Sequence, residues 1–264
     1  MHEAIPAAIP RAALVTGGAR RVGRAVVLAL ARAGFSVAVH CRNSTEEAER
    51  TAAKAREAGV RAAALRADLA HEQETVGLIG AAQAAVGPLG VLVNNASAFE
   101  RDEWDDADRQ SWDAHIEPNL RAPFVLTQGF AAALPADAHG VVVNMLDQRV
   151  WSITPHFVSY TVSKAGLWAL TRSMALALAP RIRVNAIGPG PTLPSARQTE
   201  AQFARQSASV PLRHGTTPEE VARAVLAVLA LPAMTGQMLA LDGGQHLQWS
   251  PVRSAPPTAA GIEE

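Results

Sequence analysis

The chain has 264 residues, 48% of them apolar and 18% charged, and its 24 basic and 24 acidic side chains cancel. This composition is typical of a globular enzyme, and the balanced charge gives no overall attraction to nucleic acid or to an anionic membrane. The apolar runs are shorter than the roughly 18 residues that indicate a membrane span, and the first residues lack the features of a secretory signal. The single cysteine, Cys41, excludes an internal disulfide. We therefore expect a soluble cytoplasmic protein.

Short apolar runs alternate with longer helical patterns along the chain. AALVT comes first, followed by the helical pattern RRVGRAVVLALARAG and by SVAVH; the series continues with RAAALRA, VLVNN, VVVNM, RIRVNAIG and MLALDGG. Strands that alternate with helices of about 10–15 residues predict βαβ units and a parallel sheet covered on both faces. We expect an α/β fold over residues 1–264: a single-domain Rossmann fold with a doubly wound, seven-stranded parallel sheet.

Two segments depart from this alternation. Residues from about 190 to 212 include GPGPTLPSARQTEAQ, a proline-rich stretch between a strand and a helix. Long irregular segments of this kind are frequently functional, and we expect this one to cover the substrate. The tail from about residue 250 is rich in Pro and Ala and is expected to be an extended or frayed terminus.

A glycine-rich turn, TGGARRVG at residues 16–23, connects the first strand to the next helix. Glycines at such a turn, Gly17 among them, let a pyrophosphate approach the backbone, with its charge at the positive end of the helix. The position of this turn after the first strand predicts a nucleotide site.

The end of the second predicted strand reads VHCRNS. Enzymes of this build that use NAD place an acidic residue here for the ribose hydroxyls, whereas a basic residue accommodates a 2′-phosphate. Cys41 occupies the position of the acid, with His40, Arg42 and Ser44 around it, and Arg20 of the glycine turn is placed to reach the same phosphate. The alternative is that these are solvated loop residues. The missing acid favours NADP over NAD.

Two further motifs follow. Asn95 and Ala96 come directly after a buried strand, where small residues let a cofactor lie close and an amide can bond backbone or ribose. Tyr160 and Lys164 are four residues apart, one turn of a helix. A phenol with a pKa near 10 needs its anion stabilised to act as a catalyst at neutral pH, and a lysine one turn away does this and can also hold the nicotinamide ribose.

The chain resembles the short-chain dehydrogenase/reductase family over nearly its entire length. The resemblance rests on TG…G, NNA, Tyr-x-x-x-Lys, the PG at residues 189–190 and the DGG at residues 242–244. It implies a hydride-transferring enzyme, usually a homotetramer built on the helices before and after the fifth strand. It also implies that Asp68 and Leu69 lie beside the adenine, and that Asn119 belongs to a water-linked proton relay to Lys164.

Three positions depart from the ordinary members of this family. Arg21 and Ser97 replace glycines, and Asp147 replaces a serine. Together with Phe99, they match the pattern of the pteridine reductases and the related dihydromonapterin reductase. This resemblance implies that Phe99 stacks on a pterin ring.

The carboxylate of Asp147 stands thirteen positions before Tyr160. An ionised carboxylate has no hydrogen to donate to a ketone oxygen and would repel it, unless burial or a proton shared with Tyr160 neutralised it. A ring C=N substrate avoids this conflict, because its nitrogen is the atom that receives the proton and the ring brings N–H donors of its own. We expect hydride transfer from NADPH to a pteridine-like C=N bond, with the proton delivered through Tyr160, Lys164 lowering the tyrosine's pKa, and Asp147 orienting the ring or relaying the proton.

The residues and the resemblance together give three sets of expected positions. The catalytic residues are Tyr160, Lys164, Asp147 and Asn119, and the substrate contacts are Arg21, Ser97, Phe99, Asp147 and Tyr160. The cofactor contacts are Gly17, Arg20, Arg21, Val22, His40, Arg42, Ser44, Asp68, Leu69, Asn95, Ala96, Ser97, Tyr160, Lys164, Pro189, Gly190 and Thr192.

Other interpretations stay open at this level. Asp147 is alternatively a structural residue at a strand end, with Ser97 and Phe99 serving packing. The enzyme is then a carbonyl reductase of the same family, or an NADP-binding protein without turnover. Trp104, Trp151 and His156 fall near the expected pocket, and His156 is better explained as a loop residue than as a catalyst. No cluster has the spacing of metal ligands, so we expect no metal.

Overall fold

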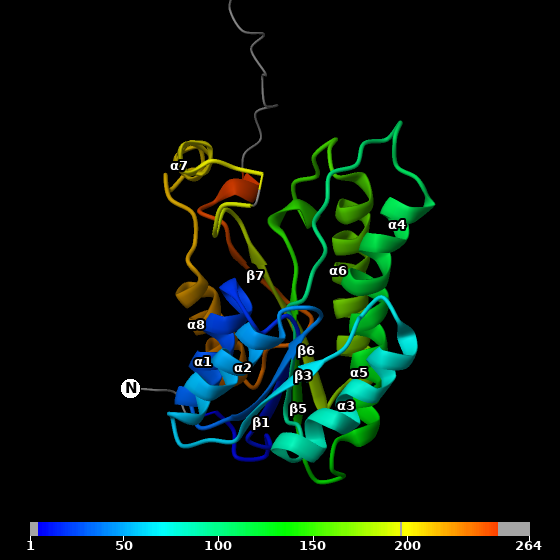
Figure 1. Cartoon of the computed structure of the whole chain (residues 1–264), viewed down its shortest axis with the longest axis vertical. Helices are drawn as coiled ribbons and strands as arrows, with labels where there is room; N and C mark the ends of the chain where they lie inside the picture. Colours follow the sequence, from blue (N-terminus) through cyan, green and yellow to red (C-terminus); the bar gives the residue numbers. More distant parts are fainter. Residues whose placement is uncertain (1–4, 196, 248–264) are drawn as a thin grey trace, which may run out of the picture.

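Seven parallel strands form one sheet in the computed structural model, which describes residues 5–195 and 197–247 (Figure 1). The strand order is β3-β2-β1-β4-β5-β6-β7, so the predicted doubly wound sheet is confirmed. The tail from residue 250 lies outside the described residues. The strands are β1 (Ala12–Val15), β2 (Ser36–Cys41), β3 (Ala62–Arg66), β4 (Val91–Asn94), β5 (Gly140–Met145), β6 (Ile182–Pro189) and β7 (Met238–Leu241).

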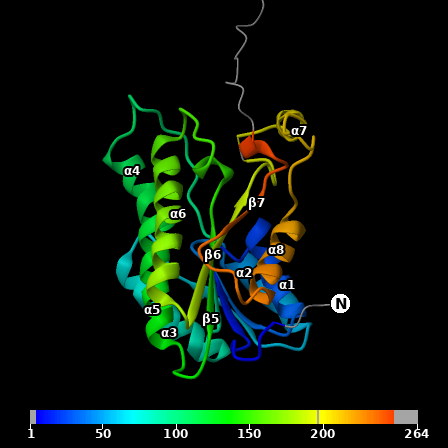
Figure 2. The same cartoon turned by 180° about the vertical axis from the view of Figure 1, so that it is seen from behind.

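Helices cover both faces of the sheet, as Figures 1 and 2 show from opposite sides. One face carries α1 (Arg21–Arg32), α2 (Thr45–Arg56) and α8 (Pro218–Ala230). The other carries α3 (Glu72–Val86), α5 (Ala122–Ala133) and α6 (Val158–Leu178). The remaining helices are α4 (Arg109–Ile116), the π-helical turn Glu117–Arg121, the 3₁₀ turns Gln148–Val150 and Gln245–Leu247, and α7 (Glu200–Ala208).

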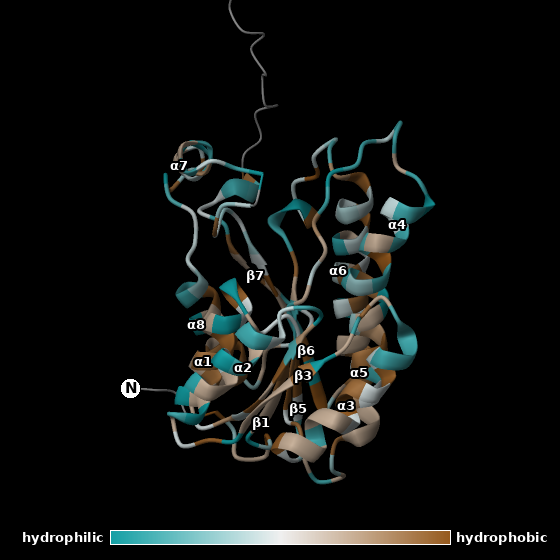
Figure 3. Cartoon of the chain, viewed as in Figure 1, coloured by the Kyte–Doolittle hydropathy of each residue, from teal (hydrophilic) through white to brown (hydrophobic). Residues whose placement is uncertain are grey.

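Along each strand, successive side chains pack alternately on the two faces of the sheet. In β1, Ala13 and Val15 belong to the apolar core under α1 and α8, whereas Ala12 and Leu14 belong to the core under α3 and α5. Successive side chains of a strand point to opposite faces, so a strand buried on both sides must be apolar throughout. Figure 3 accordingly shows hydrophobic colour along the strands and hydrophilic colour on the outward parts of helices such as α2. No helix within the described residues is both long and apolar enough to span a membrane.

Buried amides fix the position of α6 on the sheet. Asn94 at the end of β4 donates through Nδ2 to Asn144 Oδ1 on β5 at 2.8 Å, and Asn144 Nδ2 donates to Thr171 Oγ1 on α6 at 2.8 Å. Buried polar chains of this kind specify one arrangement, because another register would leave these donors unpaired in the interior at a cost in free energy. The helix that carries Tyr160 and Lys164 therefore has a fixed register relative to the carboxyl ends of β4 and β5.

Candidate active site

The glycine turn after β1 is held in shape by side chains of two strand ends. Thr16 Oγ1 accepts from the backbone N–H groups of Asn95 and Ala96 at 2.9 and 3.0 Å. Asn95 Nδ2 donates to the carbonyls of Thr16 and Gly17 at 2.9 and 3.2 Å. Gly17 has a φ of +63°, and a Cβ on Gly23 would lie 2.1 Å from the Gly17 carbonyl oxygen. The amide of Asn95 thus binds backbone, the first of its two expected roles.

His40 supports the same turn from beneath, and the structure differs here from the sequence-based expectation. The backbone N–H of Gly17 donates to His40 Nδ1 at 3.1 Å, so the ring hydrogen is on Nε2, which lies 3.0 Å from the carbonyl oxygen of Ala67. Burial lowers the pKa of His40. Because the ring is buried and both nitrogens are used, His40 positions the glycine turn and has no donor for a 2′-phosphate.

Backbone donors and exposed cations meet where β1 and β2 end. The cap residue of α1, Arg20, makes no side-chain hydrogen bond to the helix, so no side chain caps the N–H groups of its first turn. Such groups are an anion site. The Arg20 guanidinium lies 3.9 Å from Glu47, and the segment just after β2 carries the exposed Arg42 and the partly exposed Ser44. This donor set fits a nucleotide with an additional phosphate.

Cys41, at the place of the acid of an NAD enzyme, is buried, and burial raises the pKa of its thiol. It offers no charge to a ribose. The buried thiol therefore supplies no carboxylate for a ribose at the position where an NAD enzyme has its acid.

The other expected cofactor contacts lie along the same edge. Asp68 follows β3 and accepts from the N–H of Ala70 at 3.0 Å, beside the buried Leu69. Gly190, just past β6, donates its N–H to Leu241 of β7 at 3.0 Å, and Thr192 Oγ1 donates to the Gly190 carbonyl at 2.9 Å. Two further expected cofactor contacts are Pro189, the last residue of β6, and Val22 of α1, which packs on the apolar core.

The centre of the site joins α6 to the end of β5. The hydroxyl of Tyr160 donates to Asp147 Oδ2 at 3.0 Å, and Lys164 Nζ donates to the Met145 carbonyl at 2.8 Å, 5.8 Å from the Tyr160 ring centroid. Burial and then the charge of Asp147 raise the pKa of Tyr160 well above its ordinary value. Burial lowers the pKa of Lys164 to about 8, although Asp147 opposes this shift.

Asn119 lies in the π-helical turn Glu117–Arg121 and is fully buried. Its Oδ1 accepts from Ala98 N at 2.8 Å, and its Nδ2 donates to Ala98 O and to Ser163 Oγ, both at 3.0 Å. These bonds hold the segment after β4 against α6. The side chain makes no direct bond to Lys164, and the water-linked relay stays a prediction.

Phe99 stands at the site with one face already covered. Its ring stacks on Phe157, with 4.7 Å between centroids and 7° between planes, and meets the edge of Tyr160 at 4.7 Å and 69°. Phe157 precedes α6 and has a φ of +59°, an unusual backbone conformation that marks a constrained position. A flat substrate has to use the other face of Phe99 or displace Phe157.

The segment after β6 closes over these rings. Arg21, itself at a φ of +54°, donates to the carbonyls of Pro194 and Leu193 at 3.0 and 3.4 Å. Arg197 Nη2 donates to the Phe99 carbonyl at 2.8 Å. Arg21 therefore binds the predicted substrate loop. Ser97 is exposed, with its hydroxyl donating to Ala98 O at 3.1 Å.

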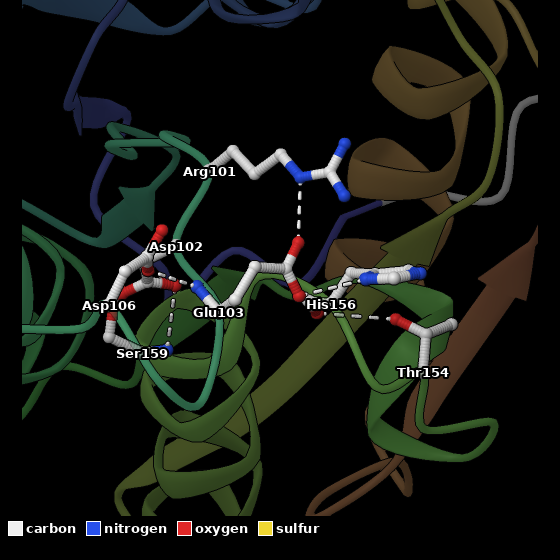
Figure 4. Close-up of polar contacts among 7 residues, drawn as sticks. All are labelled: Arg101, Asp102, Glu103, Asp106, Thr154, His156 and Ser159. Carbon is white, nitrogen blue, oxygen red and sulfur yellow. Dashed lines mark hydrogen bonds and ion pairs between the residues drawn. The ribbon is translucent and has the colours of Figure 1, made fainter.

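The aromatic and histidine residues expected near the pocket have separate places. Trp151 meets the His246 ring at 5.0 Å, Trp104 is 83% exposed, and His156 bonds Glu103 at 2.9 Å. The hydrogen bond from His156, followed by that from Arg101, lowers the pKa of Glu103 (Figure 4). Within residues 5–195 and 197–247 no group of His, Cys, Asp and Glu forms a metal-binding cluster.

Asp102 is a site residue that the sequence did not reveal. Figure 4 shows its carboxylate facing Ser159 at the start of α6. Oδ1 accepts from Ser159 N at 3.2 Å, Oδ2 accepts from the hydroxyls of Ser159 and Ser111, and the Asp102 carbonyl accepts from Phe157 N at 2.9 Å. This buried carboxylate caps the helix one residue before Tyr160. No motif marks it, because the residues that it binds at the start of α6, Phe157 and Ser159, are more than fifty residues away in the chain.

Replacing Asp102 by Asn is expected to lower the free energy of unfolding by roughly 1–3 kcal/mol, because an amide NH₂ would face the donors that the carboxylate now satisfies. Thermal or urea unfolding measures the change. Glu103→Gln is the matched control: its carboxylate is at the surface, and its loss is expected to be much smaller. Equal losses in both variants would refute the capping role.

These features define a nucleotide-binding oxidoreductase of the Rossmann type. The sequence profile described as short chain dehydrogenase matches residues 11–205, and the protein belongs to that family. An oxidoreductase of Mycobacterium tuberculosis is 35% identical, covering 89% of this chain and 91% of the relative. The putative ketoacyl reductase 2 of the granaticin polyketide synthase of Streptomyces violaceoruber is 34% identical over 89% of this chain and 96% of its own.

The chain is also similar to two crystal structures of FolM alternative dihydrofolate reductase 1, each in complex with NADP. The Brucella canis protein is 46% identical, with a TM-score of 0.90, over 95% of this chain and 100% of that one. The Brucella suis protein is 47% identical, with a TM-score of 0.89, over 94% of this chain and 99% of that one.

Proposed function

We propose that the protein is an NADPH-dependent reductase of a C=N bond in a pteridine-like heterocycle. The observation that carries this proposal is the 3.0 Å hydrogen bond from the Tyr160 hydroxyl to Asp147. A carboxylate at that place repels the oxygen of a ketone but can accept from the N–H groups of a flat heterocycle. The similarity to FolM alternative dihydrofolate reductase 1 supports the same substrate class.

NADP(H) is the proposed cofactor. The N–H groups at the start of α1, Arg20 and Arg42 would hold its phosphates, and Lys164 would hold the nicotinamide ribose. When bound, NADPH would supply the hydride. The two similar crystal structures are complexes with NADP, in agreement with this assignment.

The residues of the chain would move the proton. Tyr160 donates its hydroxyl proton toward the reduced ring nitrogen, and the cationic Lys164 stabilises the resulting phenolate. Asp147 accepts hydrogen bonds from the ring N–H groups, and after the product has left it passes a proton from solvent water to the Tyr160 phenolate. Arg21 and Phe99 would border the ring, with the segment bound by Arg21 keeping water from it.

A carbonyl reductase is the second candidate, and a specific observation favours it. The 3-oxoacyl-[acyl-carrier-protein] reductase of Staphylococcus aureus is 30% identical over 90% of this chain and 98% of its own, and the Streptomyces relative is described as a ketoacyl reductase. Such a reaction would require Asp147 to carry a proton at the ketone oxygen.

The proposal includes a cytoplasmic homotetramer that associates through α5 and α6. Leu176 and Val162 of α6 are 84% and 41% exposed, which leaves apolar surface on that helix for a second copy.

The test is oxidation of NADPH and of NADH with dihydropterins, dihydrofolate, ketones and aldehydes as acceptors. We expect turnover with the reduced pterins and with NADPH in preference to NADH. Turnover of ketones alone would replace the proposal by the second candidate. Binding of NADPH without turnover of any acceptor would indicate an NADP-binding protein that lacks the reaction.

A further inference from the structure

Arg149 is a cation beside the Tyr160 ring that has no acidic partner among the described residues, and it lies there together with Lys164, whose Nζ is 5.8 Å from the centroid of that ring. It lies in the 3₁₀ turn Gln148–Val150, two residues after Asp147. Its guanidinium carbon is 4.8 Å from the ring centroid of Phe157, 5.6 Å from that of Phe99 and 6.0 Å from that of Tyr160. An arginine placed against aromatic rings in this way is attracted by their π faces.

No acidic side chain of the described residues forms an ion pair with this guanidinium. Its Nη1 is buried, and its side chain makes no hydrogen bond or ion pair with the rest of the chain that the structure describes. Its backbone N–H donates to Asp147 Oδ1 at 2.9 Å, so the residue is attached to the carboxylate through the main chain alone. A partly buried guanidinium without an anion is costly unless the surroundings use its charge.

The other cations around the aromatic rings are already paired. Arg197, whose guanidinium carbon is 5.7 Å from the Phe99 ring, forms an ion pair with Glu100. Arg101, at 5.9 Å from the Phe157 ring, pairs with Glu103 at 2.7 Å.

The other titratable groups around the Tyr160 hydroxyl do not by themselves fix the net charge that acts on it. The His115 ring is 6.0 Å from the Tyr160 ring, and its Nε2 accepts from the backbone N–H of Glu100 at 2.9 Å, so in this arrangement it adds no charge. The pKa of Lys164 is about 8, so this side chain is a cation only below that pH. Asp147 places a carboxylate oxygen directly on the hydroxyl. An arginine remains charged at every pH at which the protein is folded.

We propose that Arg149 is a positioning residue that acts through Tyr160, supplying the fixed positive charge that offsets Asp147 at the phenol. Without that charge, the carboxylate would make the phenolate of Tyr160 too costly to form as the proton leaves. The guanidinium acts in the direction required, since it lowers the pKa of Tyr160 against burial and Asp147. This inference rests on the proposed role of Tyr160 as proton donor.

The chain allows a direct test, because Tyr160 is its single tyrosine. Absorbance of the tyrosinate band during a rapid pH jump therefore reports on this one phenol, with Tyr160→Phe as the blank. The titration is made in an Asp147→Asn variant. Removing the carboxylate lowers the pKa of Tyr160, so that the phenol titrates below the pH at which alkaline unfolding begins. Arg149→Met and Arg149→Gln remove the charge, Arg149→Lys keeps it, and Arg197→Met is the matched control in the same aromatic cluster.

Arg149→Met and Arg149→Gln are expected to raise the titration midpoint by roughly one pH unit, the shift expected from one opposite charge within about 6 Å. Arg149→Lys should restore most of the shift, and Arg197→Met should leave the midpoint unchanged. An unchanged midpoint in both neutral variants, or an equal rise in Arg197→Met, overturns the inference. The titration uses no substrate, so it is independent of whether pterins are reduced.

A second readout uses turnover in the chain with Asp147 present. A weaker acid at position 160 should lower kcat at neutral pH by roughly three- to tenfold with little change in KM. A loss that appears in KM alone would contradict the inference, because it would place the arginine in substrate binding.

Discussion

Tyr160→Phe is expected to lower kcat for reduction of the preferred substrate by roughly 10²–10⁴-fold, the usual contribution of a positioned general acid. The hydroxyl is the group that meets Asp147 at 3.0 Å, and a phenylalanine leaves no proton to deliver. The ring would remain packed against Phe99 and His115, so the site keeps its shape. Steady-state oxidation of NADPH with a dihydropterin measures the loss.

The control for this variant is cofactor binding. Fluorescence titration with NADPH should give a Kd within a few-fold of that of the unmodified protein, because the variant removes one hydroxyl of the expected cofactor contacts and leaves the backbone donors at α1 untouched. A variant that retains more than a tenth of the original kcat would show that another group delivers the proton.

The rate of the reaction is expected to fall above about pH 8, where Lys164 loses its proton. Burial has lowered the pKa of this lysine to about 8, so it is a cation at neutral pH and becomes neutral as the pH rises. The neutral amine no longer stabilises the phenolate of Tyr160. We expect kcat/KM for NADPH, which reports on the free enzyme, to be level near pH 7 and then to fall about tenfold per pH unit.

Two variants separate this titration from other causes. Lys164→Met should be slower than the unmodified protein by roughly 10²-fold at neutral pH and should lack the limb near pH 8. Lys164→Arg keeps a charge that does not titrate, and its profile should stay level beyond that pH. A limb near pH 8 that persists in Lys164→Met would assign it to another group.

The fold was predictable because it depends on local patterns. The runs at β1, β4 and β5 are apolar except for Asn94 and Asn144 near the strand ends, and the glycine turn follows the first of them. Tyr160 and Lys164 share one helix, and Asp147 lies just beyond the end of β5. Their spacing along the chain therefore brings the three side chains to one place in the structure.

The remaining parts of the site depend on contacts between distant segments. His40 was expected at a phosphate because it stands next to the position of the missing acid at the end of β2, but its ring accepts a hydrogen bond from Gly17. Arg21 reaches residues 193–194, more than 170 positions away, and Asp102 caps a helix that begins at Val158. These contacts depend on how the loops pack against one another, and the hydrophobic periodicity of the sequence does not predict that packing.

The stacking of Phe99 on Phe157 is another contact between distant segments that the sequence did not predict. The sequence favours an aromatic ring at this position for a flat substrate, and the ring does lie beside Tyr160. Its partner Phe157 carries no motif, and the contact arises because the start of α6 turns back over the segment after β4. One face of Phe99 is therefore taken by Phe157.

The most direct measurement is the ratio of kcat/KM for a dihydropterin to that for a ketone, before and after Asp147→Ser. The account predicts that the unmodified protein favours the dihydropterin and that the serine variant loses roughly 10²-fold on it, while its activity on the ketone is kept or rises. The reason is that a serine hydroxyl donates to a ketone oxygen, whereas a carboxylate accepts from a heterocyclic N–H. A ratio that does not change on this substitution would contradict the role of Asp147 and with it the proposed reaction.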